Sequence, residues 1–417
     1  MSTTDLRPAT TFRHATLANG LEVVAECTPG AHSTGLAFFV QTGARDESDE
    51  VSGVSHFLEH MVFKGTDKRS AADVNRELDE IGSNSNAYTS EEQTVYHATV
   101  LPEYQSQVTE LLADILRPAL RDDDFQTEKK VILEEIAKYD DQPPYGAHDK
   151  CMSAHFGSHP LGRSILGTAA SVGALTPQQM RAYFDLRYSP SNIVLAAAGR
   201  VDFEQLVADA ERWCGGWERR AIDRQIERAA PNSSFTLMRK ESAKQQYTIE
   251  IGNFPSAQDE DRFAARLLAN IIGDDLGSRL FWELIDTGRA EYAGLANYEY
   301  QGTGIFSAYL CCQPEDAREN WETLSEVLAH VQDEGVTADE LERAKSKICS
   351  HIVLSAERPS NRLFSVGNNW VQRRAYRTVR ETVDVYRSVT LEALHRLIAQ
   401  YPLTQRTTVS IGPLETW

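Results

Sequence analysis

The chain has 417 residues, of which 41% are apolar and 25% are charged, and this ordinary globular composition excludes a disordered or collagen-like protein. Its formal net charge is −19 at pH 7, and an acidic surface repels phosphate backbones, so we expect no nucleic-acid partner. Its apolar runs are far shorter than the roughly 18 residues of a membrane span, so we expect no membrane partner. The six cysteines contain no C-x-x-C pair and the N-terminus shows no secretory signal, which together predict a cytoplasmic protein with reduced thiols.

The first half of the chain predicts a mixture of strands and helices. Alternating apolar residues predict strands within 20–42, around a turn at Pro29 and Gly30. Helical spacing and strand-like runs then follow in a regular order: helices at 53–64, 70–81, 102–119 and 122–139, and strands at 88–100 and 192–199.

The second half repeats this order. A strand-like run at 247–252 is followed by an acidic loop and an apolar helix at 263–272, as the first half has a strand, an acidic loop and a helix. Between the halves, residues 216–234 are rich in charge and poor in large apolar side chains, which indicates an exposed linker. We therefore predict two related domains, residues 1–217 and 234–417, joined by a linker at 218–233.

The strongest local signal is the sequence His-Phe-Leu-Glu-His at 56–60. On a helix, His56 and His60 are one turn apart and project from one face, so both imidazoles can reach one metal ion. Glu59 lies on the flank of that face, where it could take a proton from a water on the metal. This is the H-x-x-E-H arrangement of inverzincins. The alternative for His56 and His60, taken without other residues, is a surface helix whose two histidines bind no metal.

A zinc site also needs a third protein ligand and an open fourth position. The helix at 122–139 offers Glu135 or its neighbour Glu134, and periodicity alone does not choose between them. Glu128 lies two turns before Glu135 on the same face and could orient a ligand through a hydrogen bond. The alternative for these carboxylates is a solvated acidic face.

Three motifs together resemble the pitrilysin (insulinase) family of zinc metallopeptidases, which includes the mitochondrial processing peptidase. They are GVSHFLEHMVFKGT at 53–66, IGSNSNAYTS at 81–90 and VILEEI at 131–136. Further matches are HPLGR at 159–163 and YSPSN at 188–192, so the resemblance covers most of residues 15–200 in the family's order.

The resemblance implies a function and a set of site residues. It implies His56, His60 and Glu135 as ligands of one zinc ion per chain, Glu59 as the general base, and Glu128 as the carboxylate behind the ligands. It implies an α+β fold of two similar domains, each a mainly antiparallel sheet with packed helices, and a clamshell dimer that encloses an unfolded peptide. The metal site would belong to the domain at 1–217. Asn86 and Ala87 would lie on the family's edge strand, which pairs with the substrate backbone.

The sequence departs from the family pattern in its second half. The family places an Arg seven residues before a Tyr to grip the substrate carbonyl and the oxyanion. Here Tyr292 is retained, but the Arg position holds Ile285, with Arg289 nearby at a different spacing. We therefore expect a zinc endopeptidase acting on extended peptides, as a homodimer or as a heterodimer with a related chain. The alternative is a weakly active or non-catalytic subunit that holds peptides for a partner.

Overall fold

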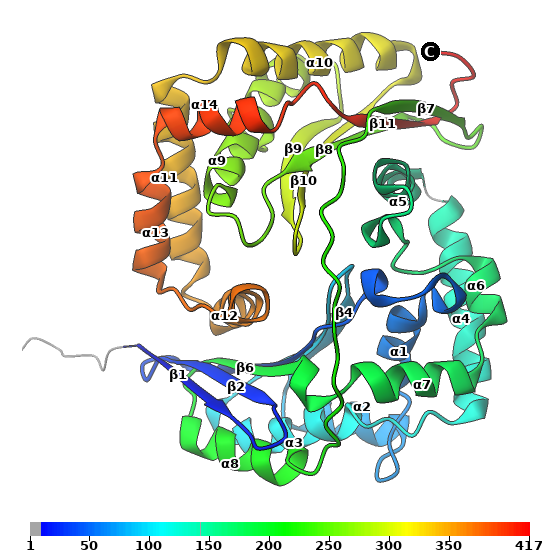
Figure 1. Ribbon diagram of the computed structural model, residues 1–417, viewed down its shortest axis with the longest axis vertical. Coiled ribbons are helices and arrows are strands. Elements are labelled where there is room, and N and C mark those ends of the chain that lie inside the picture. Colours follow the sequence, from blue (N-terminus) through cyan, green and yellow to red (C-terminus); the bar gives the residue numbers. More distant parts are fainter. Residues whose placement is uncertain (1–9, 142) are drawn as a thin grey trace, which may run out of the picture. The chain divides into compact units, whose positions relative to one another are not determined.

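The computed structural model describes residues 10–141 and 143–417, and the contacts among them form two compact units (Figure 1). The first unit contains the described residues up to Ile136 together with Ser164–Arg224 and Leu354–Arg377. The second contains Ala137–Arg163, Gln225–Val353 and Thr378–Trp417. Each unit is described below by itself.

The first unit is built on a six-stranded sheet with the order β1-β2-β6-β3-β5-β4. All neighbours in this sheet are antiparallel except β2 and β6. Its strands are β1 (Thr11–Thr16), β2 (Glu22–Cys27), β3 (Thr34–Val40), β4 (Asn84–Thr89), β5 (Thr94–Val100) and β6 (Ile193–Gly199). Its helices are α1 (Val54–Val62), α2 (Ala71–Glu80), α3 (Gln105–Ile115), α4 (Asp122–Asp141), α6 (Ala169–Ala174), α7 (Pro177–Arg187), α8 (Phe203–Cys214) and α12 (Pro359–Arg373); α4 continues past the boundary of the unit at Ile136.

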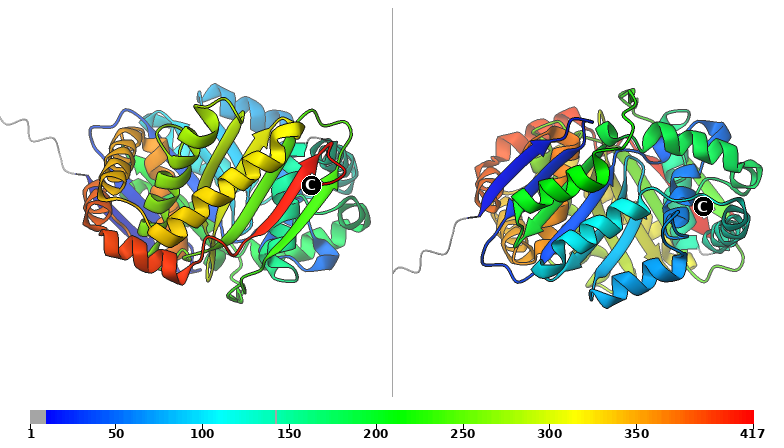
Figure 2. Two further views of the ribbon diagram at one scale, coloured as in Figure 1. Left: turned by 90° about the horizontal axis from the view of Figure 1, so that it is seen from above. Right: turned by 90° about the horizontal axis from the view of Figure 1, so that it is seen from below.

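The second unit has a five-stranded sheet with the order β7-β11-β8-β10-β9, in which β11 lies between β7 and β8 (Figure 2). Only β7 and β11 are parallel. Its strands are β7 (Ser234–Arg239), β8 (Gln246–Phe254), β9 (Tyr292–Glu299), β10 (Gly304–Cys312) and β11 (Thr407–Gly412). Its helices are α5 (Pro143–Phe156), α9 (Arg262–Gly273), α10 (Ala317–Glu334), α11 (Ala338–Ser355), α13 (Val379–Ser388) and α14 (Leu391–Gln400). None of the helices in the described part of the chain is both long and apolar enough to span a membrane.

The two sheets share one topology, apart from the additional β1. In each, the first strand pairs in parallel with the last, and the third strand in the chain forms the far edge, as β4 and β9 do. This confirms the predicted α+β fold of two related sheets. The predicted strand at 247–252 and helix at 263–272 correspond to β8 and α9.

Both faces of each sheet are covered by helices, which explains the long apolar runs in the sequence. In β3, Leu36 and Phe38 pack into one cluster with α1 and α3, while Ala37 and Phe39 pack on the opposite face against Leu363 of α12. Because both sides of the strand face apolar helices, all seven residues of β3 are buried.

In both units the second face is covered by a helix from the other half of the sequence. Helix α12 covers the first sheet and comes so close that a Cβ on Gly367 would lie 2.2 Å from the ring of Phe39. Helix α5 covers the second sheet, where Cys151 and Phe156 join Ile249 in one cluster.

The predicted linker at 218–233 contains a boundary between the two units, because Arg224 belongs to the first unit and Gln225 to the second. However, α5 comes from the first half of the sequence and belongs to the second unit, and α12 comes from the second half and belongs to the first unit. The predicted boundaries of two related domains, 1–217 and 234–417, stay a prediction.

The prediction of a single strand at 88–100 is wrong. These residues contain the end of β4, a turn, and β5, so that β4 and β5 form a hairpin. The amide of Ser90 donates to the carbonyl of Gln93 at 2.8 Å, and the hydroxyl of Ser90 accepts from the amide of Gln93 at 3.2 Å. This local side-chain turn competes with extended backbone, and it reverses the chain.

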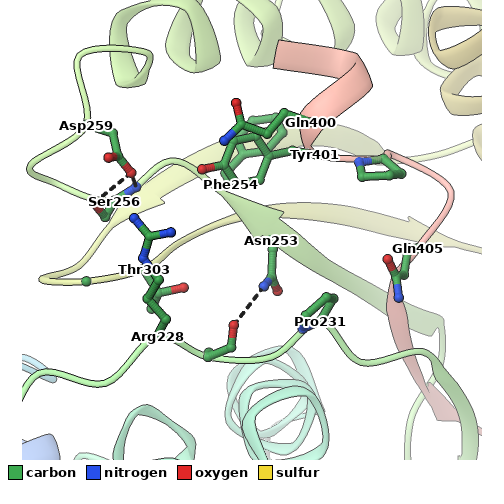
Figure 3. A pocket seen from close by; sticks show the side chains of 13 residues that line it. Arg228, Pro231, Asn253, Phe254, Ser256, Asp259, Thr303, Gln400, Tyr401 and Gln405 are labelled. Atoms are coloured by element: carbon green, nitrogen blue, oxygen red, sulfur yellow. Dashed lines mark hydrogen bonds between the residues drawn. The ribbon is translucent and has the colours of Figure 1, made fainter. Parts of the chain in front are cut away.

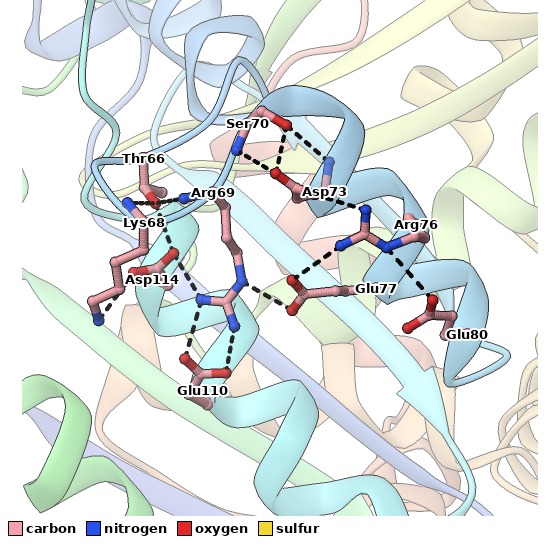
Figure 4. A network of polar contacts seen from close by, with 10 residues as sticks. All are labelled: Thr66, Lys68, Arg69, Ser70, Asp73, Arg76, Glu77, Glu80, Glu110 and Asp114. Carbon is pink, nitrogen blue, oxygen red and sulfur yellow. Dashed lines mark hydrogen bonds and ion pairs between the residues drawn. The ribbon is translucent and has the colours of Figure 1, made fainter.

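A network of charges holds the segment that follows α1 (Figure 4). The Arg69 guanidinium donates to Glu77 of α2 at 2.9 Å, to Asp114 of α3 at 2.9 Å, and through two nitrogens to Glu110 of α3 at 2.8 and 3.0 Å. Burial raises the pKa of Asp114, but hydrogen bonds from Arg69 and Thr66 outweigh it and hold that pKa below its ordinary value. Arg69 therefore fixes the segment between α1 and α2 to the helices α2 and α3.

We expect Arg69→Met to lower the free energy of unfolding at pH 7 by about 3 kcal/mol, because it leaves largely buried carboxylates without their partner. The folded-state pKa of Asp114 is lowered, so its stabilising contribution is present above its unfolded pKa and is lost as the pH falls. The difference between wild type and variant should therefore shrink below about pH 4. Urea unfolding at pH 7 and in acid measures both effects.

Arg76→Met is the matched control. Arg76 pairs with Asp73 at 2.7 Å and approaches Glu80 at 3.5 Å, but its side chain is 55% exposed. Exposed ion pairs of this kind contribute less than about 1 kcal/mol. Equal losses for the two variants would contradict the role given to Arg69.

Candidate metal centre

The helix α1 begins at a buried position that only glycine fits. Gly53 has φ +92°, and a Cβ there would lie 2.6 Å from the carbonyl oxygen of Leu166. The carboxyl oxygens of Glu47 accept hydrogen bonds from the amides of Gly53 and Ser55, both at 2.7 Å. Burial raises the pKa of Glu47 to about 8, while the two amide donors lower it. Glu47 thus satisfies amides that every helix N-terminus leaves free, at a place that water does not reach.

The predicted metal ligands come together on the described part of the chain. His56 and His60 lie on successive turns of α1, with ring centroids 4.7 Å apart. Glu135 of α4 places its Oε2 3.9 Å from Nε2 of His56 and 3.8 Å from Nε2 of His60. One ligand atom from each residue lies within 4.8 Å of the other two. The side chain of Glu134 is exposed and is not part of this group.

The chemistry of this group suits a zinc ion. Two imidazoles and one carboxylate form a donor set that zinc enzymes use, with a fourth position left for water or substrate. Burial, followed by the charge of His60, lowers the pKa of His56 to about 4, so its imidazole is neutral at pH 7 and can donate a lone pair. The Nδ1 atom of His56 is buried and has no hydrogen-bond partner among the described residues.

Glu128 fixes the second imidazole. Its Oε1 lies 2.8 Å from Nδ1 of His60, which directs the other ring nitrogen of His60 towards Glu135. Lys64, two residues beyond the end of α1, places its Nζ 2.5 Å from Oε2 of Glu128. Burial raises the pKa of Glu128, but hydrogen bonds from Lys64 and His60 hold it below its ordinary value. The carboxylate of Glu128 therefore links the imidazole of His60 to the ammonium group of Lys64.

Glu59 stands beside the group without belonging to it. Its Oε2 accepts a hydrogen bond of 2.6 Å from the hydroxyl of Thr89, at the end of β4. Burial raises the pKa of Glu59, and the hydrogen bond from Thr89 lowers it. This leaves a half-buried carboxylate on the flank of the two imidazoles.

The strand β4 forms the edge of the first sheet nearest to α1. Ala87 is only 9% exposed and packs in the core that includes α1, whereas the side chain of Asn86 is exposed. The amide of Ala87 is bonded at 2.9 Å to the side-chain oxygen of Asn86 instead of to a neighbouring strand. Beyond β4 no further strand of the described chain pairs with this sheet.

The residues predicted in the second half belong to the second unit. Tyr292 is the first residue of β9, the edge of that sheet, and its side chain is 46% exposed. Ile285 lies in a π turn at Phe281–Ile285 and packs against the unit's apolar core. Arg289 forms an ion pair of 2.9 Å with Glu319. The structure therefore gives Arg289 a partner within its own unit.

The second unit also contains a pocket of about 260 Å³ beside the linker (Figure 3). Phe254 and Tyr401 form an aromatic side of it, and Arg228 and Pro231 come from the linker. None of the residues with a predicted role lines this pocket.

Sequence reasoning missed three residues around the first site: Glu47, Lys64 and Thr89. Thr89 and Lys64 stand in the motifs at 81–90 and 53–66, but nothing in their spacing showed that they contact Glu59 and Glu128. Glu47 lies in an acidic loop where several neighbours are also acidic, so no pattern singled it out.

Known proteins match this chain over most of its length. Residues 22–169 match the family described as insulinase (peptidase family M16), and residues 174–348 match the peptidase M16 inactive domain. A protein of Mycobacterium tuberculosis, named an uncharacterized zinc protease, is 33% identical over 94% of this chain and 91% of its own length. An uncharacterized zinc protease of Bacillus subtilis is 30% identical over 93% of this chain and 95% of its own length.

Solved structures show the same fold. A protease from Helicobacter pylori superposes with a TM-score of 0.91 at 21% identity, over 97% of this chain and 100% of that one. Complex III from Candida albicans contains a chain with a TM-score of 0.84 at 17% identity, over 97% of this chain and 96% of that one. Matches of both halves to one family, and relatives above 30% identity over nearly the full length, show that the chain belongs to peptidase family M16, the insulinase family.

Proposed function

We propose that the chain is a zinc-dependent endopeptidase that hydrolyses extended or unfolded peptides. The observation that carries this proposal is the group formed by His56, His60 and Glu135, with the carboxylate of Glu59 beside it. The relatives named as zinc proteases support the same reaction class.

His56, His60 and Glu135 would hold one zinc ion, with Glu128 fixing the ring of His60 through its Nδ1. Zinc bound there would supply Lewis-acid chemistry, polarising the scissile carbonyl and lowering the pKa of water. The chain's own contribution is a rigid set of donors. His56 is kept neutral by burial, and the ring of His60 is held in one orientation by Glu128.

Glu59 would act as the general base and then as the general acid. Its Oε2 accepts the hydroxyl hydrogen of Thr89, and the carboxylate also bonds to the backbone of Thr89. Oε1, which does not take the Thr89 hydroxyl, would take the proton from the attacking water. The same oxygen would later deliver this proton to the leaving amine. The raised pKa of Glu59, caused by burial, makes the carboxylate a better proton acceptor than an exposed glutamate.

The edge strand β4 would bind the substrate. A peptide added alongside Asn86 and Ala87 would be extended, because an edge strand offers its unpaired backbone groups only to another strand. For that pairing, the side chain of Asn86 would have to release the amide of Ala87 that it now covers. Tyr292, contributed by the facing subunit of a dimer, would stabilise the oxyanion as a hydrogen-bond donor.

A second candidate function is a peptide-holding subunit that needs a related chain, in a homodimer or a heterodimer. It is favoured by Ile285, which stands where the family resemblance places an arginine. The assembled metal group favours catalysis, because a subunit that only holds peptides has no need of three converging ligands. If a partner supplies the arginine, the purified chain would be nearly inert and the added partner would restore cleavage.

We expect Glu135→Gln to lose zinc, because an amide replaces the only anionic ligand of the group. Glu134→Gln is its control, since that exposed neighbour differs by one position and lies outside the group. Zinc content after dialysis, measured by atomic emission, should be about one per chain for wild type and for the control, and near zero for Glu135→Gln. Equal zinc contents in the two variants would contradict the assignment of Glu135.

We expect Glu59→Gln to keep its zinc but to lower kcat for peptide hydrolysis by about 10²- to 10⁴-fold, because the amide cannot accept the proton. Cleavage of a mixed peptide library by the purified, zinc-loaded chain, followed by mass spectrometry, measures this. Cleavage by the variant at the wild-type rate would remove Glu59 from the mechanism.

We expect Tyr292→Phe to lower kcat by about 10²-fold, as the loss of an oxyanion donor does, with its fold intact. Tyr298→Phe is the matched control, because Tyr298 lies on the same strand with a similar exposed fraction, 44% against 46%. Similar kinetics for both variants would show that the hydroxyl of Tyr292 takes no part in the reaction.

A further inference from the structure

The hydroxyl of Thr89 joins the edge strand β4 to the carboxylate of Glu59. We propose that Thr89 is a positioning residue, which orients the Glu59 carboxylate so that one oxygen remains available for proton transfer. The proposal rests on the function proposed above, in which Glu59 is the general base. It adds a residue from the substrate-binding strand to the catalytic arrangement.

The contact has the geometry of a strong hydrogen bond. Thr89 Oγ1 lies 2.6 Å from Glu59 Oε2, which is the length typical of a hydroxyl that donates to an ionised carboxylate. A threonine hydroxyl has one hydrogen to give, and here Glu59 receives it. The contact therefore fixes the rotation of the two carboxylate oxygens of Glu59.

Thr89 is held in place by the pairing of β4 with β5, while its hydroxyl hydrogen goes to Glu59. It pairs with Thr94 across the β4–β5 hairpin, and the two hydroxyl oxygens are 3.5 Å apart. Thr94 is fully buried and donates to the backbone carbonyl of Thr42 at 3.0 Å, so its own hydrogen is not directed at Thr89. The turn after Thr89 is closed by the amide of Ser90 bonding to Gln93.

The position of Thr89 in β4 explains why it can reach the helix. Alternate residues of a strand point to the same face, so Thr89 and Ala87 project to one side. Ala87 packs in the core that includes Phe57 and Leu58 of α1. The same side of the strand therefore faces α1, on which Glu59 lies next to the metal group.

Such a contact should act on the rate of the chemical step. A general base must hold its oxygen within hydrogen-bond reach of the proton it removes, and a freely rotating carboxylate satisfies this only part of the time. Thr89 does not take the place of a metal ligand, so its removal should leave zinc binding intact. A valine of the same shape at this position removes the side-chain hydrogen bond and leaves the backbone hydrogen bond of Thr89 to Glu59 in place.

The experiment compares Thr89→Val, Thr89→Ser and the control Thr99→Val with wild type and Glu59→Gln. Thr99 lies on β5, in the same sheet, and is as fully part of a strand as Thr89. For each zinc-loaded chain, kcat and KM are measured on one peptide, together with zinc content and the midpoint of thermal unfolding.

We expect Thr89→Val to lower kcat by about 10- to 100-fold, the effect of losing a hydrogen bond to a charged group, with KM within about twofold. Zinc content and thermal midpoint should match those of Thr99→Val. Thr89→Ser keeps the hydroxyl and should recover most of the wild-type kcat.

The other outcomes overturn the proposal in distinguishable ways. A wild-type kcat in Thr89→Val, or an equal loss in Thr89→Ser and Thr89→Val, would show that the hydroxyl does not position Glu59. Loss of zinc or of thermal stability in Thr89→Val would show a structural role instead. If wild type and Glu59→Gln cleave equally, or neither cleaves, the proposed function fails first and the role of Thr89 fails with it.

Discussion

The placement of the short helix α1 determines the metal centre. Within five residues it carries two imidazoles and one carboxylate, and its first turn is buried where water cannot satisfy the free amides. Glu47 accepts from two of these amides, and Gly53 allows the backbone to pass close to Leu166. The helix is thus fixed at its beginning by the buried carboxyl group of Glu47 and beyond its end by the charges around Arg69.

The two units share one sheet topology but differ in the side chains that their helices bury against it. In the first, α1 carries polar groups, and each of them has a specific partner or a place in the metal group. In the second, α9 packs on the edge strand β9, and its buried residues are almost all apolar. A helix with buried polar side chains needs a partner for each, so the first unit also contains Glu128, Lys64 and Thr89 around α1.

Much of the metal site could be predicted because it depends on helical geometry. A separation of four residues places His56 and His60 on one face wherever the helix lies. The choice between Glu134 and Glu135 could not be made from periodicity, because it depends on how α4 is rotated against α1, which is a matter of tertiary packing. The contacts of Thr89 and Glu47 join segments that are far apart in sequence, and no local pattern encodes them. The hairpin within 88–100 was missed because the polar run at 89–94 contains neither Gly nor Pro, and the turn is made by the side chain of Ser90.

Helices α5 and α12 each complete the unit of the opposite half of the sequence, and this has a consequence for synthesis on the ribosome. When the first half has emerged, the face of its sheet formed by Ala37 and Phe39 still lacks α12, whose residues are translated more than 100 positions later. That apolar face must stay exposed, or be shielded by a chaperone, until the chain is nearly complete. Pairings so distant in sequence also make closure of the first unit slow. Because of the exchange of two helices, the unit that carries the candidate metal group is completed late, after most of the chain has been translated.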